Sequence, residues 1–149
     1  MNILIIDDSE PDQKTVCEYL SQSKCKNTIT TAETMEEGRG QLQSFHFDLV
    51  LLDLFLPDSE GIETVKTALE CVKTSTENKD TPIIVLTGNE DYSIGKAAVK
   101  MGVKDFLIKD NITPKQLSRA VSFATFLEQL PRKMGIINKT KNLFIGLVS

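Results

Sequence analysis

"MNILIIDDSE", residues 1–10, places an apolar run from Ile3 to Ile6 directly before two aspartates, Asp7 and Asp8. A run that is apolar throughout predicts a strand covered on both faces, as in a parallel sheet wrapped by helices. Adjacent carboxylates raise the cost of ionising each other, so a pair at the end of a buried strand calls for a compensating positive charge. The stretch therefore predicts a parallel sheet with a charged site at one edge.

The same pattern recurs along the chain, where short β-branched apolar runs alternate with stretches of helical periodicity. Helix starts are marked by a capping box, T-x-x-E at residues 34–37, and by Pro11 and Pro114. These signals predict an α/β fold of the (βα)5 type, a doubly wound five-stranded parallel sheet with helices on both sides. The polar segment "TSTENKDT", residues 74–81, is interpreted as a loose loop within the domain. The predicted strands are residues 3–6, 28–31, 49–52, 83–86 and 106–108.

Composition limits the classes of function. A chain of 149 residues, 40% hydrophobic and 26% charged, is typical of one globular domain. The net charge of -4 argues against direct binding of nucleic acid. No apolar run is long enough for a transmembrane segment and no signal peptide is recognised, so we expect a cytoplasmic protein. The three cysteines form no C-x-x-C pair, which argues against a disulfide framework or a cysteine-bound metal.

Four of the predicted strands end in side chains that can bind a metal or a phosphate. Asp7 and Asp8 follow the first strand, Asp53 the third, Thr87 the fourth and Lys109 the fifth. Ligands of open parallel sheets bind beyond the carboxyl ends of the strands. Three carboxylates suit Mg²⁺, while a hydroxyl and an ammonium suit the oxygens of a phosphoryl group. We therefore predict a magnesium-dependent phosphoryl site.

Several of these residues also have a plain structural explanation. Asp8 or Ser9 alone can cap the following helix, and Asp53 alone can begin a turn. Lys109 alone can be a solvated charge. The only histidine, His46, is interpreted as structural, because no cysteine or carboxylate is spaced with it as metal ligands would be. The prediction of a site therefore rests on the whole set at the strand ends.

This ordered set resembles the receiver domain of two-component response regulators. The motifs that carry the resemblance are the paired "DD" at 7–8, "DLFLPDSEG" at 53–61, "LTG" at 86–88 and "FLIK" at 106–109. The resemblance covers residues 1–130 and implies a flavodoxin-like sheet with the strand order 2-1-3-4-5. Residues 131–149 are then a basic and apolar C-terminal tail, and we expect no separate output domain.

The resemblance implies a role for each residue around the metal. Asp53 would accept a phosphoryl group from a histidine kinase. Asp8 would bind Mg²⁺ directly, Asp7 largely through water, and Asp53 and the backbone carbonyl of Phe55 would supply further ligands, with Mn²⁺ as the alternative ion. The bulk of the Phe55 side chain predicts slow self-dephosphorylation, because it obstructs the water that must attack the phosphorus.

The resemblance also implies a phosphoryl-binding switch. The Thr87 hydroxyl would move to a phosphoryl oxygen, the Lys109 ammonium would pair with it, and Phe106 would turn inward as the threonine moves. Asp53, Thr87 and Lys109 are the catalytic set on this interpretation. Receivers commonly have proline after the lysine, whereas Asp110 stands here, so we expect a trans peptide bond.

We expect a phosphoacceptor response regulator that signals through protein contact and can catalyse its own phosphorylation and dephosphorylation, rather than an enzyme with a separate substrate. The expected partners are a histidine kinase or phosphotransfer protein, a downstream protein target and, as an option, a second copy of the chain. Two alternatives stay open. One is an aspartyl-phosphate phosphatase or phosphotransferase, and the other is a binding module of receiver fold that works without phosphorylation.

The C-terminal tail carries two further expectations. Pro131 should end the fifth helix near residue 130, because proline removes an N–H and clashes with the preceding turn. The tail has four basic residues, Arg132, Lys133, Lys139 and Lys141, and ends in the apolar run "LFIGLV" at 143–148. The segment from Ile136 to Val148 packs on its own domain or is frayed, or it docks on a partner or a second copy. A third option is attachment to a membrane surface.

Overall fold

The computed structural model describes residues 1–88 and 92–133, with side chains as far as residue 126. At its centre lies a parallel sheet of five strands in the order β2-β1-β3-β6-β7, which confirms the predicted order 2-1-3-4-5. The strands of this sheet are β1 (Asn2–Ile6), β2 (Thr28–Ala32), β3 (Leu49–Leu52), β6 (Ile83–Thr87) and β7 (Asp105–Ile108). The helices are α1 (Glu10–Ser21), α2 (Met35–Ser44), α3 (Ile62–Thr74), α4 (Tyr92–Met101) and α5 (Pro114–Lys133). A small hairpin of β4 (Phe55–Leu56) and β5 (Ser59–Glu60) follows β3, and a 3-10 turn, Lys109–Asn111, follows β7.

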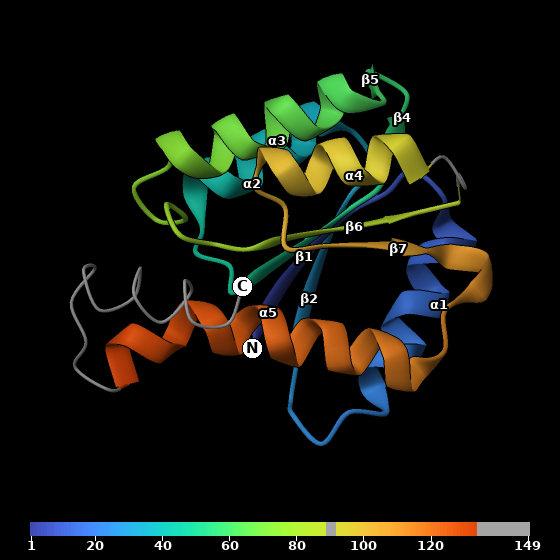
Figure 1. Cartoon of the computed structure of the whole chain (residues 1–149), viewed down its shortest axis with the longest axis vertical. Helices are drawn as coiled ribbons and strands as arrows, with labels where there is room; N and C mark the ends of the chain where they lie inside the picture. Colours follow the sequence, from blue (N-terminus) through green and yellow to red (C-terminus); the bar gives the residue numbers. More distant parts are fainter. Residues whose placement is uncertain (89–91, 134–149) are drawn as a thin grey trace.

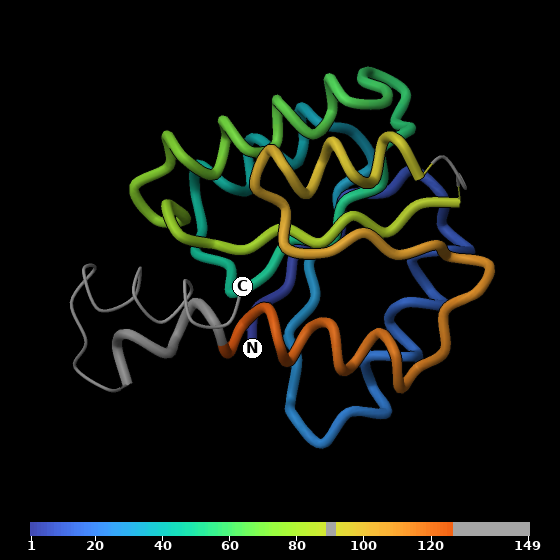
Figure 2. The backbone as a smooth tube through the Cα atoms, viewed as in Figure 1, coloured from blue at the N-terminus to red at the C-terminus, as the bar shows by residue number. Residues whose placement is uncertain are grey.

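The helices form two layers, with α2, α3 and α4 on one face of the sheet and α1 and α5 on the other (Figure 1). Successive side chains of a strand point to opposite faces. In β1, Leu4 and Ile6 therefore join the core under α2, α3 and α4, while Ile3 and Ile5 join the core under α1 and α5. Leu117 of α5 belongs to this second core, and α5 packs beside α1 on the same face of the sheet (Figure 2). Burial on both faces is the reason that the inner strands are apolar throughout.

The first two helices begin at the predicted signals. Ser9, not Asp8, is the N-cap of α1, and its hydroxyl accepts a hydrogen bond from the N–H of Asp12 at 3.3 Å. In the capping box of α2, the Thr34 hydroxyl accepts a hydrogen bond from the N–H of Glu37 at 3.0 Å. The Glu37 carboxylate accepts one from the residue before the cap, at 2.8 Å. Asp8 is therefore left available for another role.

Helix α5 begins at Pro114, as predicted, but extends beyond its predicted end. It continues through Pro131 to Lys133, so the predicted end near residue 130 was wrong. Proline fixes φ at about -65°, which suits a helix, and its missing N–H costs one hydrogen bond to the preceding turn. One such loss in the last turn does not stop the helix. Residues 134–149, which include the segment of the docking hypothesis, lie outside the described residues.

The segment 74–81 is well anchored, contrary to the prediction of a loose loop. Asn78 is 1% exposed, and its amide group donates hydrogen bonds to the carbonyls of Leu42 and Phe45, both at 2.7 Å. Its own side-chain oxygen accepts a hydrogen bond from the N–H of Phe47 at 2.7 Å. The Ser75 hydroxyl donates to the Leu42 carbonyl at 2.8 Å. The last carbonyls of a helix lack partners within it, so these polar side chains complete the end of α2.

Three smaller observations concern earlier expectations. Among the described residues, no helix is long and apolar enough to cross a bilayer. The described peptide bonds, including that between Lys109 and Asp110, are trans, as predicted. Cys71 is buried and Cys17 half-buried, and burial raises the pKa of both thiols.

Candidate functional site

The carboxyl ends of four neighbouring strands bring the predicted site residues together, because β1, β3, β6 and β7 are paired in register. Asp53 lies at the centre of this group. Its Oδ1 accepts a hydrogen bond from the Thr87 hydroxyl at 3.0 Å, and its Oδ2 accepts one from the Lys109 ammonium at 2.8 Å. The same ammonium lies 2.6 Å from Asp7 Oδ2. A carboxylate, a hydroxyl and an ammonium from three strands thus meet at one point.

Asp7, Asp8 and Asp53 form an acidic cluster, in which one carboxylate oxygen of each lies within 4.8 Å of the others. Asp7 and Asp53 are buried, whereas Asp8 is exposed at the rim. A hard divalent cation such as Mg²⁺ is held in proteins by one or a few carboxylates together with water and phosphate oxygens. The three predicted metal-ligating side chains are therefore close enough to hold one ion.

Lys109 has a further carboxylate partner that the sequence analysis missed. Its ammonium donates a hydrogen bond to Asp12 Oδ2 at 2.8 Å, from the first turn of α1. The signal available in the sequence was a third aspartate four residues after the paired aspartates. Burial disfavours the ammonium, but its three carboxylate partners outweigh that cost and hold the pKa of Lys109 above its usual range. Lys109 is therefore a fixed positive charge within the acidic cluster.

Asp7 is the most enclosed carboxylate of the cluster, at 3% exposed against 8% for Asp53. Burial raises the pKa of Asp7 above its ordinary value, and the neighbouring charge of Asp53 acts in the same direction. Hydrogen bonds from Lys109 and from the N–H of Ser9, the latter at 2.9 Å, oppose this rise. The single positive charge of Lys109 thus offsets only part of the negative charge of these carboxylates. The rest is available for a cation to neutralise.

The β4–β5 hairpin lies directly after Asp53. The N–H of Phe55 donates a hydrogen bond to Asp53 Oδ1 at 3.2 Å, so the backbone of the predicted carbonyl ligand is held beside the cluster. Phe55 itself is 38% exposed. At the hairpin tip, the Asp58 carboxylate accepts hydrogen bonds from the N–H groups of Met35 and Glu36 at the start of α2. The sequence analysis also missed this contact.

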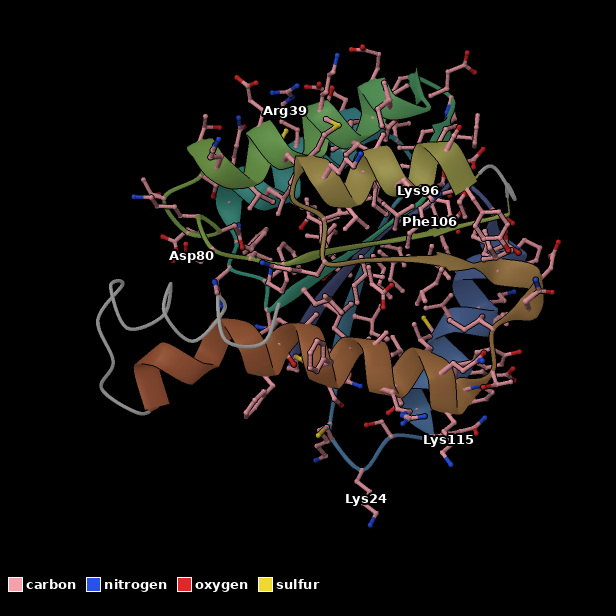
Figure 3. The ribbon with its side chains drawn as sticks, viewed as in Figure 1. Lys24, Arg39, Asp80, Lys96, Phe106 and Lys115 are labelled. Atoms are coloured by element: carbon pink, nitrogen blue, oxygen red, sulfur yellow. The ribbon has the colours of Figure 1, made fainter. Side chains whose placement is uncertain are left out.

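Phe106 lies on β7, against α4 (Figure 3). Its ring is close to Gly95, where an added Cβ would come within 2.7 Å of a ring carbon. The absence of a side chain at Gly95 therefore makes room for the ring in this position. The inward turn of Phe106, which the resemblance implies, stays a prediction.

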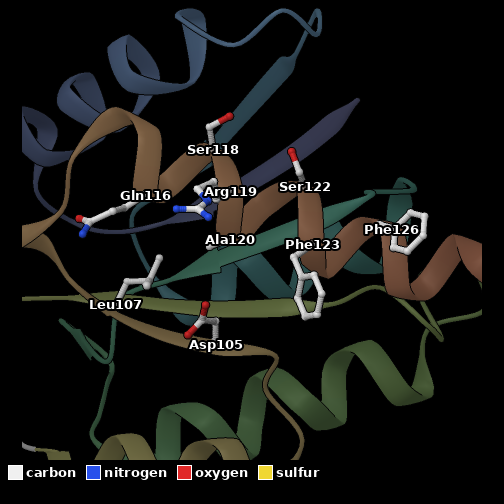
Figure 4. A pocket seen from close by; sticks show the side chains of 9 residues that line it. All are labelled: Asp105, Leu107, Gln116, Ser118, Arg119, Ala120, Ser122, Phe123 and Phe126. Atoms are coloured by element: carbon white, nitrogen blue, oxygen red, sulfur yellow. The ribbon is translucent and has the colours of Figure 1, made fainter. Parts of the chain in front are cut away.

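Two other features lie apart from the acidic cluster. A surface hollow of about 880 Å³ lies between β7 and α5, and its lining includes the exposed rings of Phe123 and Phe126 (Figure 4). No residue of the acidic cluster lines it. His46 is exposed, and its Nδ1 lies 2.8 Å from the carbonyl oxygen of Glu77, which agrees with its interpretation as structural.

Comparisons with known proteins identify the family and the fold. The family model of the response regulator receiver domain matches residues 3–122. The probable C4-dicarboxylate response regulator DctR of Halalkalibacterium halodurans is 28% identical over 134 residues, which are 90% of this chain and 54% of that protein. The chain spans about half the length of the curated relatives that it matches.

Two solved structures share the fold. The receiver domain of a sensor histidine kinase from Pseudomonas aeruginosa PAO1, which has a magnesium ion in its active-site cleft, is 19% identical with a TM-score of 0.68. That match covers 83% of this chain and 96% of the other. The Mn²⁺-bound form of response regulator Rcp1 is 23% identical with a TM-score of 0.64, covering 86% and 91%.

Proposed function

The chain belongs to the response regulator receiver domain family, and we propose on this basis that Asp53 accepts a phosphoryl group from a histidine kinase or a phosphotransfer protein. The observation that carries the proposal is the environment of its carboxylate. Asp53 is 8% exposed, and its two oxygens are bonded by the Thr87 hydroxyl and the Lys109 ammonium. These are the two kinds of donor that a phosphoryl group attached to Asp53 requires.

The transfer forms one bond and breaks another. An Asp53 carboxylate oxygen forms a new P–O bond while the P–N bond of a phosphohistidine breaks, and the imidazole leaves with the electron pair and takes a proton from solvent. Lys109 lowers the repulsion between the attacking carboxylate and the anionic donor. After transfer, the Thr87 hydroxyl can donate to a phosphoryl oxygen instead of to Asp53 Oδ1.

Asp7, Asp8, Asp53 and the Phe55 carbonyl are the groups that would hold a divalent cation. When bound, Mg²⁺ would neutralise charge on both the carboxylate and the phosphoryl group. The carboxylate cluster supports this assignment, and so do the magnesium and manganese ions named for the two structural neighbours. Mg²⁺ is the proposed ion, with Mn²⁺ as the alternative.

The output of the domain is proposed to be protein contact. A phosphoryl group adds charge beside Thr87 and Lys109, which would bias the position of Thr87 and the packing of Phe106 against α4. A changed surface at α4 and β7 would then be recognised by a downstream protein or a second copy of the chain. On this proposal the protein catalyses its own phosphorylation and dephosphorylation, and acts on no separate substrate.

The proposal is tested by incubating the protein with a small acyl phosphate and Mg²⁺ and measuring its intact mass. We expect the mass of one phosphoryl group to be added, the peptide containing Asp53 to carry it, and a chelator to prevent the gain. No gain, or a gain on another residue, would contradict the proposal. Continuous consumption of the acyl phosphate without accumulation of modified protein would instead support a phosphatase.

Replacing Phe55 by asparagine is expected to shorten the lifetime of the phosphorylated form by about threefold, or about 0.7 kcal/mol in the barrier. The proposed reason is that the Phe55 ring, two residues after Asp53, obstructs a water in line with the phosphorus. Loss of the phosphoryl group is followed by mass after removal of the donor. Phe45→Asn is the control, because Phe45 is an exposed ring just after α2. An unchanged or longer lifetime in Phe55→Asn speaks against the obstruction.

A further inference from the structure

The tip of the β4–β5 hairpin is bound to the start of α2 by one side chain. Asp58 Oδ1 accepts a hydrogen bond from the N–H of Met35 at 2.9 Å, and its Oδ2 accepts one from Glu36 at 3.0 Å. The first N–H groups of a helix have no partner within the helix, and they form the positive end of its dipole. Asp58 is exposed, so the slight desolvation that opposes its ionisation is outweighed by these hydrogen bonds, which hold the pKa of Asp58 below its ordinary value. The contact is thus charged at neutral pH.

The other anchors of the hairpin lie at its base and on α3. The N–H of Gly61 and the Thr64 hydroxyl both donate to the carbonyl of Leu54, at 2.8 and 3.1 Å. The hydroxyls of Ser59 and Thr64 lie 2.7 Å apart. With two residues in each strand, the hairpin is too short to hold its shape alone. Its position therefore depends on anchors at both ends, and Asp58 provides the one toward α2.

We propose that Asp58 is a positioning residue for the metal and phosphoryl site. The chain between Asp53 and Asp58 contains the Phe55 carbonyl, so fixing the hairpin tip against α2 also fixes the direction of that carbonyl. The proposal rests on the proposed function for the identity of the ion. One consequence can be measured without phosphorylation. Cation binding at the acidic cluster and protection of the first amides of α2 from hydrogen exchange are coupled, and each strengthens the other.

The test measures Mg²⁺ affinity by calorimetry and amide hydrogen exchange at Met35 and Glu36. Asp58→Ala is expected to weaken Mg²⁺ binding by about tenfold, the low end of what the loss of an outer partner costs a metal site. Asp58→Asn keeps one acceptor oxygen and should lie between Asp58→Ala and the wild type. Added Mg²⁺ should slow exchange of both amides in the wild type but not in Asp58→Ala.

Two control variants separate positioning from simpler effects. Thr34→Ala removes a cap from the same end of α2. The bond that is lost joins the Thr34 hydroxyl to the N–H of Glu37 and does not involve the hairpin. Glu60→Gln removes one negative charge from the same hairpin, at an exposed position. Both should bind Mg²⁺ with close to the wild-type affinity. The proposal is overturned if either control loses as much affinity as Asp58→Ala, or if Asp58→Ala loses none.

The comparison remains decisive if Asp58→Ala does not fold, because Asp58→Asn and Glu60→Gln each remove one charge and only the first weakens the anchor. Phosphoryl acceptance on Asp53 is measured separately by mass. A wild type that binds Mg²⁺ but accepts no phosphoryl group overturns the proposed function and leaves the role of Asp58 intact. A phosphorylated wild type with an unaffected Asp58→Ala overturns only the role of Asp58, and a wild type that binds no Mg²⁺ overturns both.

Discussion

Replacing Asp53 by asparagine is expected to abolish phosphoryl acceptance, with the rate of modification falling by at least about a thousandfold. The neutral amide is not a nucleophile under these conditions. Its oxygen can still accept the hydrogen bonds that Thr87 and Phe55 donate to Asp53 Oδ1, so the surrounding backbone should be retained. The measurement is intact mass after incubation with an acyl phosphate and Mg²⁺, alongside a circular dichroism spectrum to verify folding.

Asp48→Asn is the matched control, because Asp48 and Asp53 flank the same strand, β3. Asp48 precedes β3 and accepts a hydrogen bond from the N–H of Asn2 at 2.7 Å. It lies at the amino end of β3, whereas Asp53 follows the carboxyl end. It should be modified as readily as the wild type. Equal modification of Asp53→Asn, or loss of modification in Asp48→Asn, would show that the acceptor is misassigned.

Replacing Lys109 by methionine is expected to lower the free energy of unfolding by about 3 kcal/mol in the absence of divalent cations. The substitution leaves Asp7 and Asp53, whose side chains are 4% and 10% exposed, without their cationic partner. Breaking a buried ion pair costs about 3–5 kcal/mol, and the lower end applies because the side chain of Asp12 is 45% exposed and remains hydrated. The measurement is urea unfolding at neutral pH.

Added Mg²⁺ should restore part of this loss, because an ion at the acidic cluster supplies the missing positive charge. Lys66→Met is the control. Lys66 pairs with Glu63 on the surface of α3, where the side chains are 58% and 71% exposed, and such pairs contribute less than about 1 kcal/mol. A loss in Lys109→Met as small as that of the control, or one that Mg²⁺ leaves unchanged, would contradict the compensating role of Lys109.

The sequence predicted the part of the site that lies at strand ends. Asp7, Asp53, Thr87 and Lys109 each follow or complete an apolar run, and such runs are recognisable from local composition. Parallel strands then bring their carboxyl ends to one edge, so closeness in space followed from the fold class. Asp12 was missed because it lies inside a helix, where an acidic residue in the first turn is ordinary.

The sequence by itself thus determined the five strands of the central sheet and the identity of the groups at their carboxyl ends, because these depend on short-range patterns and on one rule of sheet topology. The short β4–β5 hairpin was not predicted. Only the tertiary structure decided the long-range polar contacts. Lys109 and Asp12 are 97 residues apart, and Asp58 and Met35 are 23 apart. Asn78 looked like part of a solvated loop until its buried partners were seen. A polar segment has the same amino-acid composition whether its side chains face water or bond to a helix end. Only the packing of the helices on the sheet distinguishes the two.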